Sequence, residues 1–592
     1  MRPPGRAAIE TGQSEICVRT LYVFLFLFTV LVVPFAAISA QSVESICSRP
    51  ESGTEIVSPS ELRSRQGLLR TTLSLKNSVG SDGHMRYCYV AEDGNQSPTL
   101  RLSPGDLLVL TLKNDISLPA TAMKHVVPPS NSCSSGMDLM SASSTNLHFH
   151  GLAIPPKCHA DETITTAIPS AGSTFEYRFQ VPSDTPPGLY WYHPHVHGFS
   201  EEQVLGGASG ALIVEGIERA NKLIAGLPER ILVIRDQRLS SSKSDPNRPG
   251  KDLSVNFAPV VFPDFKPAVI QMHPTEREFW RVLNASADTY LDIKVVFNDA
   301  PQFLGVVALD GVPIGYADGG SRNRILWESH VFLSPAGRAE FVLNGPPAGM
   351  KAALMAQAVE TGPTNDSDSR HATVPAKPQN PVDDDNTPSR TLVNIVSYVS
   401  APEVVTKLPM QPTVQPDTPS ARPLSTITPT RQRKLYFSEK VPDPGGPNSP
   451  TVFYITEDGK IPTAYDPFST TPNIVVHQGD VEDWLIENRS QETHAFHIHQ
   501  THFLVLERHG VPVHESYLRD TINVPYWDGF SPQYPSIKLR MDFRDKNIVG
   551  TFPYHCHILQ HEDGGMMGTI RVEPAITASD RTTHGVQVKQ AK

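Results

Sequence analysis

The segment "YHCHILQHEDGGMM", residues 554–567, constrains the fold of this 592-residue chain more than any other. It continues the run "TFP", and the combined stretch is rich in the Thr and aromatic residues that are typical of β-strands. Successive side chains of a strand point to opposite faces, so His555 and His557 share one face and Cys556 points to the other. One strand thus predicts two separate metal sites, joined through a few covalent bonds at Cys556.

The Cys556 face carries the ligand types of a redox-active metal. Two glycines, at 564 and 565, indicate a turn that brings His561 and Met566 back towards Cys556. A thiolate, imidazoles and a weak axial thioether form the ligand set of a blue-copper electron-transfer site. Such a site needs a second equatorial histidine, and His494 in "THAFHIHQTHF" is the candidate.

Histidines gather in four short segments, the one above and "STNLHFHGL", "GLYWYHPHVHG" and "THAFHIHQTHF", which together hold 12 of the 22 histidines. Each contains a His-x-His pair whose rings share one strand face. A single pair is weak evidence, because zinc sites and ordinary strands show it too. Zinc fits the whole set less well, since it prefers closed four-ligand sites and has no redox use for the cysteine link. Eight imidazoles suit three copper ions with open positions for oxygen: His148, His150, His193, His195, His497, His499, His555 and His557.

These four segments resemble the four copper-binding signatures of the multicopper oxidases, the group that includes laccases, ascorbate oxidase, bilirubin oxidase and bacterial cuprous oxidases. The match covers both ends of the mature chain. The resemblance implies four copper ions: one of type 1, one of type 2 and a type 3 pair. It assigns Cys556, His494, His561 and Met566 to type 1, His148 and His497 to type 2, and His150, His193, His195, His499, His555 and His557 to type 3.

Two acids are candidates for catalytic roles, because the reduction of O₂ to water consumes protons. Glu562 directly follows His561, at a position that resembles that of the family's proton-donating acid. Asp161, in "KCHADETI", resembles the acid that family members place near the type 2 copper. The alternative for both is a solvated surface carboxylate. Three further residues, His197, His502 and Met567, are expected to support or pack against the ligands rather than bind copper.

The first forty residues stand apart from the rest. The apolar run "LYVFLFLFTVLVVPFAAISA" ends in small residues and follows Arg19, which predicts a secretory signal peptide over residues 1–40 and a secreted or periplasmic protein. An uncleaved membrane anchor is the alternative, because the run approaches spanning length. The net charge of −11, without a basic run, argues against a nucleic-acid partner.

Cysteine usage agrees with export. One of the six cysteines lies in the leader and Cys556 is a predicted ligand, which leaves an even number for disulfides. Three pairings of these four cysteines are possible. We expect Cys47–Cys88 and Cys133–Cys158, the latter closing a loop just after the first histidine pair.

A weak internal repeat predicts the domain organisation. "LSPGDLLVLTLKND", "MHPTEREFWRVLNAS" and "VHQGDVEDWLIENRS" each read as a turn, an alternating strand and an asparagine. Three copies predict an all-β chain of three Greek-key β-sandwich domains, which the resemblance identifies as cupredoxin domains. We place these at residues 46–217, 218–400 and 434–574. All predicted ligands fall in the first and third domains, so the three-copper cluster should lie between them.

Polar and proline-rich stretches separate these domains. Residues 361–390 are almost free of large apolar side chains, which predicts a polar insertion in the second domain. Residues 401–433 contain seven prolines and should form an extended linker. Residues 575–592 should be a flexible tail.

The resemblance implies an oxidase that passes four electrons from a small reducing substrate, one at a time, to O₂, giving two waters. A laccase-like enzyme for phenols or similar aromatic donors is the first hypothesis, acting as a monomer. A metallo-oxidase for Cu(I), Fe(II) or Mn(II) is the alternative. The 12 methionines are scattered, which argues against a specialist for Cu(I) alone. A copper-storage or electron-carrier protein without turnover is a third hypothesis, which leaves the complete set of histidines unexplained.

We expect electrons to enter through the exposed edge of His494 or His561 and to pass through Cys556 to the histidines on either side. The loop "TINVPYWDGFSPQYP", from residue 521, is expected to border this site. Trp527 in this loop either stacks on an aromatic donor or simply packs the domain.

Overall fold

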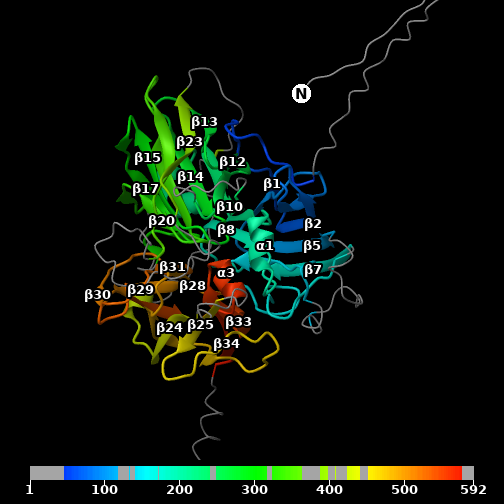
Figure 1. The fold of residues 1–592 in the computed structure, drawn as a ribbon, viewed down its shortest axis with the longest axis vertical. Helices are drawn as coiled ribbons and strands as arrows, with labels where there is room; N and C mark the ends of the chain where they lie inside the picture. Colours follow the sequence, from blue (N-terminus) through cyan, green and yellow to red (C-terminus); the bar gives the residue numbers. More distant parts are fainter. Residues whose placement is uncertain are drawn as a thin grey trace, which may run out of the picture. The chain divides into compact units, whose positions relative to one another are not determined.

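The computed structural model describes residues 46–117, 133, 140–170, 172–239, 249–316, 323–362, 387–397, 407–408, 423–440 and 451–575. Within these ranges the chain forms six β-sheets, arranged as three consecutive pairs (Figure 1). Helices there are short: α1 (Ser200–Leu205), α2 (Ile217–Ala220), α3 (Leu559–Asp563) and the 3₁₀ turns η3 (Lys222–Ile224), η5 (Leu424–Thr426) and η6 (Lys546–Ile548). None of the helices described is long and apolar enough to cross a membrane. The predicted leader lies outside the described residues.

The first module, blue to cyan in Figure 1, contains a five-stranded and a four-stranded sheet. The five-stranded sheet has the order β1 (Glu61–Arg63), β4 (Thr99–Leu102), β9 (Gly210–Val214), β8 (Gly188–His193) and β6 (His148–His150). The other has the order β3 (Met85–Ala91), β2 (Leu68–Val79), β5 (Leu107–Asp115) and β7 (Ser173–Gln180). Two of the predicted histidine segments therefore lie on adjacent strands, β6 and β8.

The second module, green in Figure 1, has an eight-stranded and a six-stranded sheet. The larger one has the order β12 (Ala258–Val260), β11 (Asp252–Val255), β10 (Glu229–Gln237), β14 (Arg277–Asn284), β21 (Arg338–Asn344), β17 (Leu304–Leu309) and β18 (Val312–Pro313), with β19 (Leu326–Glu328) on β17. The smaller one has the order β13 (Ala268–Met272), β23 (Arg390–Ser397), β22 (Ala352–Gln357), β15 (Leu291–Phe297) and β16 (Ala300–Pro301), with β20 (Val331–Leu333) on β15. None of these strands carries a predicted copper ligand.

The third module, yellow to red in Figure 1, contains a six-stranded and a five-stranded sheet. The first has the order β25 (Val452–Glu457), β24 (Arg431–Lys440), β27 (Val481–Asn488), β32 (Ser536–Asp542), β29 (Phe503–Arg508) and β30 (Val511–Pro512). The second has the order β26 (Ile474–His477), β34 (Met567–Glu573), β33 (Gly550–Cys556), β28 (His494–Ile498) and β31 (Thr521–Val524). The other two histidine segments lie on β28 and β33, which are again neighbours.

The predicted repeat is one and the same strand in each module. β5, β14 and β27 each pair in parallel with an earlier strand, respectively β2, β10 and β24. Each also pairs antiparallel with a later strand, respectively β7, β21 and β32. The three repeat segments thus have equivalent places in three similar sandwiches, and the all-β fold class is confirmed.

The asparagine at the end of each repeat strand is a buried structural residue. The side-chain amide of Asn284 donates to the carbonyl oxygens of Thr289, Leu333 and Ser334, and its oxygen accepts from the backbone of Ser286. Asn488 makes an equivalent set of contacts. Both asparagines lie in N-x-S sequons but are fully buried, so the folded chain cannot present them for glycosylation.

Each module has its own apolar core between its two sheets, and separate contacts join the modules. The first and second modules share a cluster that includes Trp191 of β8 and Val233 of β10. The first and third modules meet where α1 lies against α3, beside each other in Figure 1. There the Asp563 carboxylate accepts a hydrogen bond of 2.7 Å from the backbone of Gly198. The elements that carry the histidine pairs are thus held together at this interface.

Both predicted disulfides, Cys47–Cys88 and Cys133–Cys158, are present, and Cys556 is a free, buried cysteine. The domain boundaries stay predictions. β24 begins at Arg431, slightly before the predicted start of the third domain at residue 434. Most of the predicted insertion at 361–390 and linker at 401–433, and nearly all of the tail at 575–592, lie outside the described residues.

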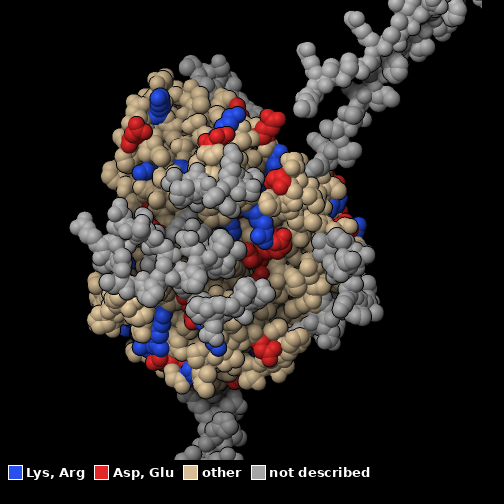
Figure 2. Space-filling view, in the orientation of Figure 1, with Lys and Arg blue, Asp and Glu red and all other residues tan. Residues whose placement is uncertain are grey.

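Charged side chains of both signs are mixed on the surface. On the described part of the face in Figure 2, basic and acidic residues lie interspersed among uncharged ones. Partly exposed side chains of opposite charge form ion pairs, such as Arg238 with Glu202 and Arg489 with Asp458. The charge on this face is therefore distributed rather than collected into one patch.

Candidate metal centre

Cys556, His494 and His561 bring their ligand atoms together inside the third module. Sγ of Cys556, at the end of β33, lies 3.7 Å from Nδ1 of both histidines, and the two Nδ1 atoms are 3.0 Å apart. All three residues are buried, and their ligand atoms fit around a single ion. Met566 is buried beside them, since its carbonyl oxygen accepts the backbone N–H of Cys556 at 3.1 Å.

The strand register explains why this site is separate from the other histidines. β28 and β33 are antiparallel, with Phe496 opposite Cys556 and His497 opposite His555. The Cys556 side chain therefore faces the module's interior, whereas His555 faces the histidines of the first module. The predicted alternation of faces is confirmed by the contacts that these side chains make.

The eight remaining imidazoles meet between the first and third modules. Two groups of three have ligand atoms close enough for one ion each: His150, His193 and His557 form one, and His195, His499 and His555 form the other. His148 and His497 approach each other in a further group with His150. The structure thus brings together every histidine predicted for the cluster.

The hydrogen bonding of these rings fits metal binding. Nδ1 of His193, His497 and His555 each pairs with a backbone carbonyl oxygen, at 2.9, 2.8 and 2.9 Å. A proton on Nδ1 leaves the lone pair on Nε2, which fixes the tautomer that a metal ligand needs. Several buried ring nitrogens have no hydrogen-bond partner among the described residues, and a bound metal would account for one such nitrogen on each ring: Nε2 of His148, His193 and His497, Nδ1 of His150 and His499, and both nitrogens of His557.

Electrostatics keep these imidazoles in the form that binds metals. Burial, reinforced by neighbouring histidines, holds the pKa well below its usual value for six of them: His150, His193, His195, His497, His499 and His557. Burial likewise lowers the pKa of His555 to about 3. Neutral imidazole is the metal ligand, so the cluster is ready to bind cations at neutral pH.

Glu562 lies against the histidine group of His195, His499 and His555. Its two carboxyl oxygens are 3.7 Å from Nδ1 of His195 and 3.5 Å from Nδ1 of His555. Burial, with Asp563 and Cys556 nearby, raises the pKa of Glu562 well above its usual value. The shift favours the protonated form of this carboxyl group, which lies directly beside the cluster.

Asp161 lies at the other side of the cluster. Its carboxylate is 3.0 Å from Nδ1 of His148 and accepts the backbone N–H of Phe149 at 2.9 Å. Gln500, from the third module, also donates to it. Asp161 is 1% exposed and Glu562 is fully buried, so neither is a solvated surface carboxylate.

The residues expected to support the ligands have packing or hydrogen-bonding contacts. The ring of His197 lies edge-on to Tyr465, with centroids 4.9 Å apart. His502 Nε2 pairs with the carbonyl oxygen of Asp310 at 3.0 Å. Met567 is buried on β34, opposite His555.

The expectation of an exposed type 1 histidine edge is wrong, because His494 and His561 are 0% and 1% exposed. The loop between β27 and β28 folds over them. Ser490 Oγ pairs with Nε2 of His494 at 2.7 Å, and a Glu492 oxygen lies 3.4 Å from Nε2 of His561. Sequence reasoning missed this cover, since nothing in "NRSQETH" distinguishes it from an ordinary turn.

The aromatic loop from residue 521 does border this site. The backbone N–H of Trp527 donates to the carbonyl oxygen of Ser490 at 2.8 Å. The hydroxyl group of Ser490 in turn contacts His494. The ring of Trp527 lies edge-on to that of Tyr534. Phe530, in the same loop, is 58% exposed. Trp527 thus packs within its own loop, while the loop offers aromatic surface near the buried histidine.

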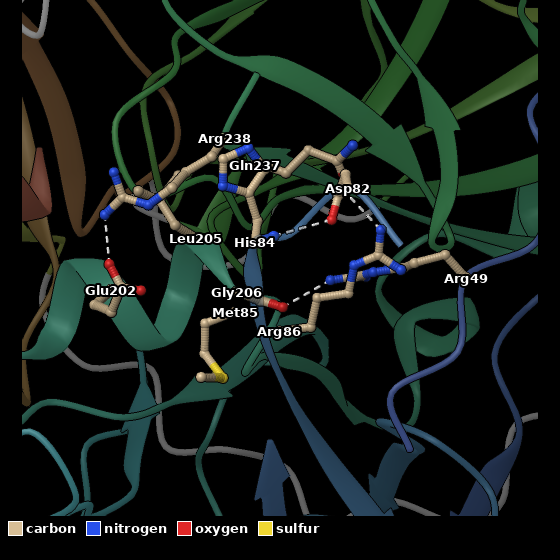
Figure 3. A pocket seen from close by; sticks show the side chains of 10 residues that line it. All are labelled: Arg49, Asp82, His84, Met85, Arg86, Glu202, Leu205, Gly206, Gln237 and Arg238. Carbon is tan, nitrogen blue, oxygen red and sulfur yellow. Dashed lines mark hydrogen bonds and ion pairs between the residues drawn. The ribbon is translucent and has the colours of Figure 1, made fainter. Parts of the chain in front are cut away.

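A pocket lies away from all predicted ligands, near α1 (Figure 3). Ion pairs join Arg86 with Asp82 and Arg238 with Glu202 across it, and Arg49 donates to the carbonyl oxygen of Gly206. Nε and Nη1 of Arg49 have no hydrogen-bond partner among the described residues, and no predicted copper ligand lines the pocket. The histidine-rich interface, not this pocket, carries the chemistry.

Comparison with known proteins decides the family. Two family models, both described as multicopper oxidase, match residues 138–219 and 445–575, the two parts that carry the four histidine segments and Cys556. The chain belongs to the multicopper oxidase family. The oxidase is 23% identical over 514 residues to multicopper oxidase mco of Staphylococcus haemolyticus, covering 84% of this chain and 85% of that one. It is also 22% identical over 512 residues to a laccase of Bacillus stratosphericus, covering 79% and 88%. Membership of this family makes it a copper-dependent oxidoreductase.

Solved structures confirm the fold. A multicopper oxidase of Campylobacter jejuni, described as a metallo-oxidase, superposes with a TM-score of 0.59 at 24% identity, covering 89% of this oxidase and 96% of that chain. A variant of McoA from Aquifex aeolicus gives 0.61 at 18% identity, covering 88% and 100%. The predicted architecture of three cupredoxin-like sandwiches is therefore confirmed.

Proposed function

We propose that this oxidase holds four copper ions and couples four one-electron oxidations of a donor to the reduction of O₂ to two waters. The observation that carries the proposal is the linkage of two kinds of site by one tripeptide. Cys556 belongs to a thiolate site with His494 and His561, while His555 and His557 belong to the two histidine triads at the module interface. Storage of copper requires no such link.

The residues divide among the copper ions as the resemblance implies. Cys556, His494, His561 and Met566 hold type 1, His148 and His497 hold type 2, and the six triad histidines hold the type 3 pair. Copper in these sites supplies one-electron redox chemistry and the binding of O₂. The chain supplies a short covalent route, since only the Cys556 backbone and its neighbours separate the thiolate from His555 and His557.

Glu562 is the proposed proton donor of the reaction. Burial raises the pKa of its carboxyl group well above the usual value, and the group lies within 4 Å of two imidazoles of one triad. A neutral acid at such a place can release a proton as oxygen is reduced, and be reloaded between turnovers. Asp161 takes a different role: it orients His148 by accepting from Nδ1.

Phenols are the first proposed class of donor. The loop that carries Trp527, Phe530 and Tyr534 reaches Ser490, whose hydroxyl contacts His494. Aromatic rings on this loop can stack on a phenol and hold it near the type 1 site. Electron transfer needs no direct contact with the metal, so a loosely held donor suffices.

One observation favours metal ions as the second candidate class. Glu492 places a carboxylate oxygen 3.4 Å from Nε2 of His561, with the Glu492 side chain 15% exposed. Carboxylate oxygens are ligands of divalent cations, and an anionic group at the ring edge favours a positively charged donor.

Export from the cytoplasm is also part of the proposal. The apolar leader at residues 1–40 has the pattern of a signal peptide. The two disulfides support this, because such bonds persist in oxidising compartments. The alternative of a membrane-anchored enzyme predicts a mature protein that retains the leader, which N-terminal sequencing would reveal.

Oxygen uptake by the copper-loaded protein tests the donor assignment. We would offer a dimethoxyphenol, Fe(II), Mn(II) and Cu(I) separately, with Cys556→Ser as the inactive control. Glu492→Gln should lower kcat/KM for metal ions at least about tenfold, the equivalent of ~1.4 kcal/mol, if a carboxylate guides the cation. Phenol oxidation should stay within about twofold of the parent. Equal losses with both donor classes would contradict a role for Glu492 in recognising cations.

A further inference from the structure

Arg338 and Asp520 form a buried, two-point ion pair between the second and third modules. Arg338 is the first residue of β21, and Asp520 directly precedes β31. Nη1 lies 2.7 Å from Oδ1, Nη2 lies 2.5 Å from Oδ2, and both side chains are fully buried. A planar guanidinium matches a carboxylate in this geometry, so each group fixes the orientation of the other.

The same guanidinium also reaches the first module. Nε of Arg338 donates to the carbonyl oxygen of Leu189 in β8 at 3.2 Å, and Nη1 donates to that of Ala336 at 3.0 Å. Arg338 therefore contacts all three modules. Its own module supplies none of the predicted copper ligands.

Asp520 in turn contacts two predicted ligands. Its Oδ1 lies 3.3 Å from Nε2 of His150, and its backbone carbonyl oxygen accepts from Nδ1 of His497 at 2.8 Å. These contacts leave Nδ1 of His150 and Nε2 of His497 as the nitrogens that would bind a metal ion, and neither has a hydrogen-bond partner among the described residues. Asp520 thus determines which ring nitrogen stays available for a metal on His150 of the first module and on His497 of the third module.

The glycine after His150 makes room for this pair. Gly151 has a φ of +88°, and a Cβ added there would lie 2.7 Å from Oδ2 of Asp520 and 2.8 Å from Nη2 of Arg338. Any larger residue would displace one partner of the pair. Gly151 therefore allows both the turn after His150 and the close contact between Arg338 and Asp520.

We propose that Arg338 is a positioning residue for the three-copper cluster, which orients the Asp520 carboxylate and through it the His150 ring. The proposal rests on the proposed copper chemistry of the cluster. The second module thereby acts on a cluster to which it supplies no ligand. Contacts that orient a metal-binding histidine through its other nitrogen commonly change metal affinity 10- to 100-fold when removed, on the order of the effect expected here.

Arg338→Lys is the direct test, because lysine keeps the charge but loses the two-point geometry. Arg281→Lys is the matched control, because Arg281 is equally buried. Arg281 lies on β14, the strand next to β21, and forms ion pairs with Glu229 and Glu340 instead of Asp520. Both variants and the parent would be copper-loaded and titrated with a chelator. The electron paramagnetic resonance signal of the copper held by His148 and His497 reports the cluster, and the visible absorption of the Cys556 site is the internal reference.

We expect Arg338→Lys to hold cluster copper about 10- to 100-fold more weakly, with the Cys556 absorption unchanged and Arg281→Lys like the parent. Retention of cluster copper equal to that of the parent would overturn the inference while leaving the proposed function intact. An equal loss in Arg281→Lys would also overturn it, since general destabilisation would then account for both. A parent chain that binds no copper at the histidine interface would overturn both proposals.

A double variant decides the question if Arg338→Lys does not fold. Arg338→Met combined with Asp520→Asn removes both charges, which avoids leaving one buried charge without its partner. The loss of cluster copper expected for this variant is the same. Parent-like copper retention in the folded double variant would overturn the inference.

Discussion

Glu562 shows how much a single residue's surroundings determine its chemistry. The same carboxyl on the surface would be ionised at neutral pH, whereas burial beside His195 and His555 raises its pKa well above the usual value and favours the protonated form. Its neighbour Asp563 has a raised pKa of about 7, also because of burial, although hydrogen bonds from the α1 backbone oppose the shift. Two carboxyl groups with raised pKa values therefore lie next to the histidine triads, where the proposed reaction needs proton donors.

Replacing Glu562 by glutamine should slow turnover while leaving the copper sites intact. Glutamine keeps the shape but cannot donate a proton, so kcat should fall by about 10²- to 10⁴-fold. Steady-state oxygen uptake measures this, and the copper content per chain shows whether the sites are still filled. Glu92→Gln, on an exposed turn, is the control and should match the parent. Unchanged turnover in Glu562→Gln would remove this residue from the mechanism.

Glu492 and Ser490 show what could not be predicted at the residue scale. Both lie in "NRSQETH", where sequence alone shows a polar turn before a histidine strand. Their contacts with His561 and His494 depend on how that turn folds back, and on Thr361 from the second module. The ligands themselves were predictable, because strand alternation is a local rule; the cover over them is not local.

At the scale of elements, the short helices α1 and α3 couple the first and third modules through half-buried carboxyl groups. The backbone of Glu201 donates to Asp563 at 2.9 Å. Burial, with Asp288 and Asp563 nearby, raises the pKa of Glu201 from 4.5 to about 8. In the unfolded chain the same group ionises at its ordinary pKa.

This difference predicts a stability that falls as pH rises. Between pH 4.5 and 8 the unfolded chain has lost the Glu201 proton and the folded chain has not, so the unfolded state binds fewer protons and the free energy of unfolding decreases. Glu201→Gln should flatten this slope by up to about 1.4 kcal/mol per pH unit. Denaturant unfolding of the copper-loaded protein at several pH values measures it. Glu202→Gln, at the half-exposed neighbouring position, is the control. Parallel pH profiles for the parent and Glu201→Gln would contradict the assignment.

The repeated strand is the element that sequence analysis predicted best. β5, β14 and β27 have the same parallel and antiparallel neighbours, and Asn114, Asn284 and Asn488 make similar contacts where these strands end. A turn, an alternating strand and an asparagine are local features, so they survive in the sequence. The pairing of other strands, such as β13 with β23 across more than one hundred residues, left no such local signal.

At the scale of the whole molecule, the fold brings four separate segments to one place. The histidine pairs lie on neighbouring strands within each module, β6 with β8 and β28 with β33, and the contact between modules completes the triads. The sequence predicted that the first and third modules would share the cluster, because only they carry ligands. It did not predict the proposed role of the second module in the cluster, because Arg338 contacts Asp520, a residue 182 positions away in the chain.

The ratio of donor oxidised to O₂ consumed tests the central claim most directly. The copper-loaded oxidase would be given a fixed, limiting amount of oxygen and an excess of a one-electron donor that it turns over. We predict four donor molecules oxidised per O₂, no hydrogen peroxide, and loss of both oxygen uptake and donor oxidation in Cys556→Ser. A ratio of two with accumulating peroxide, or full activity in Cys556→Ser, would contradict an oxidase in which a thiolate site feeds a three-copper cluster.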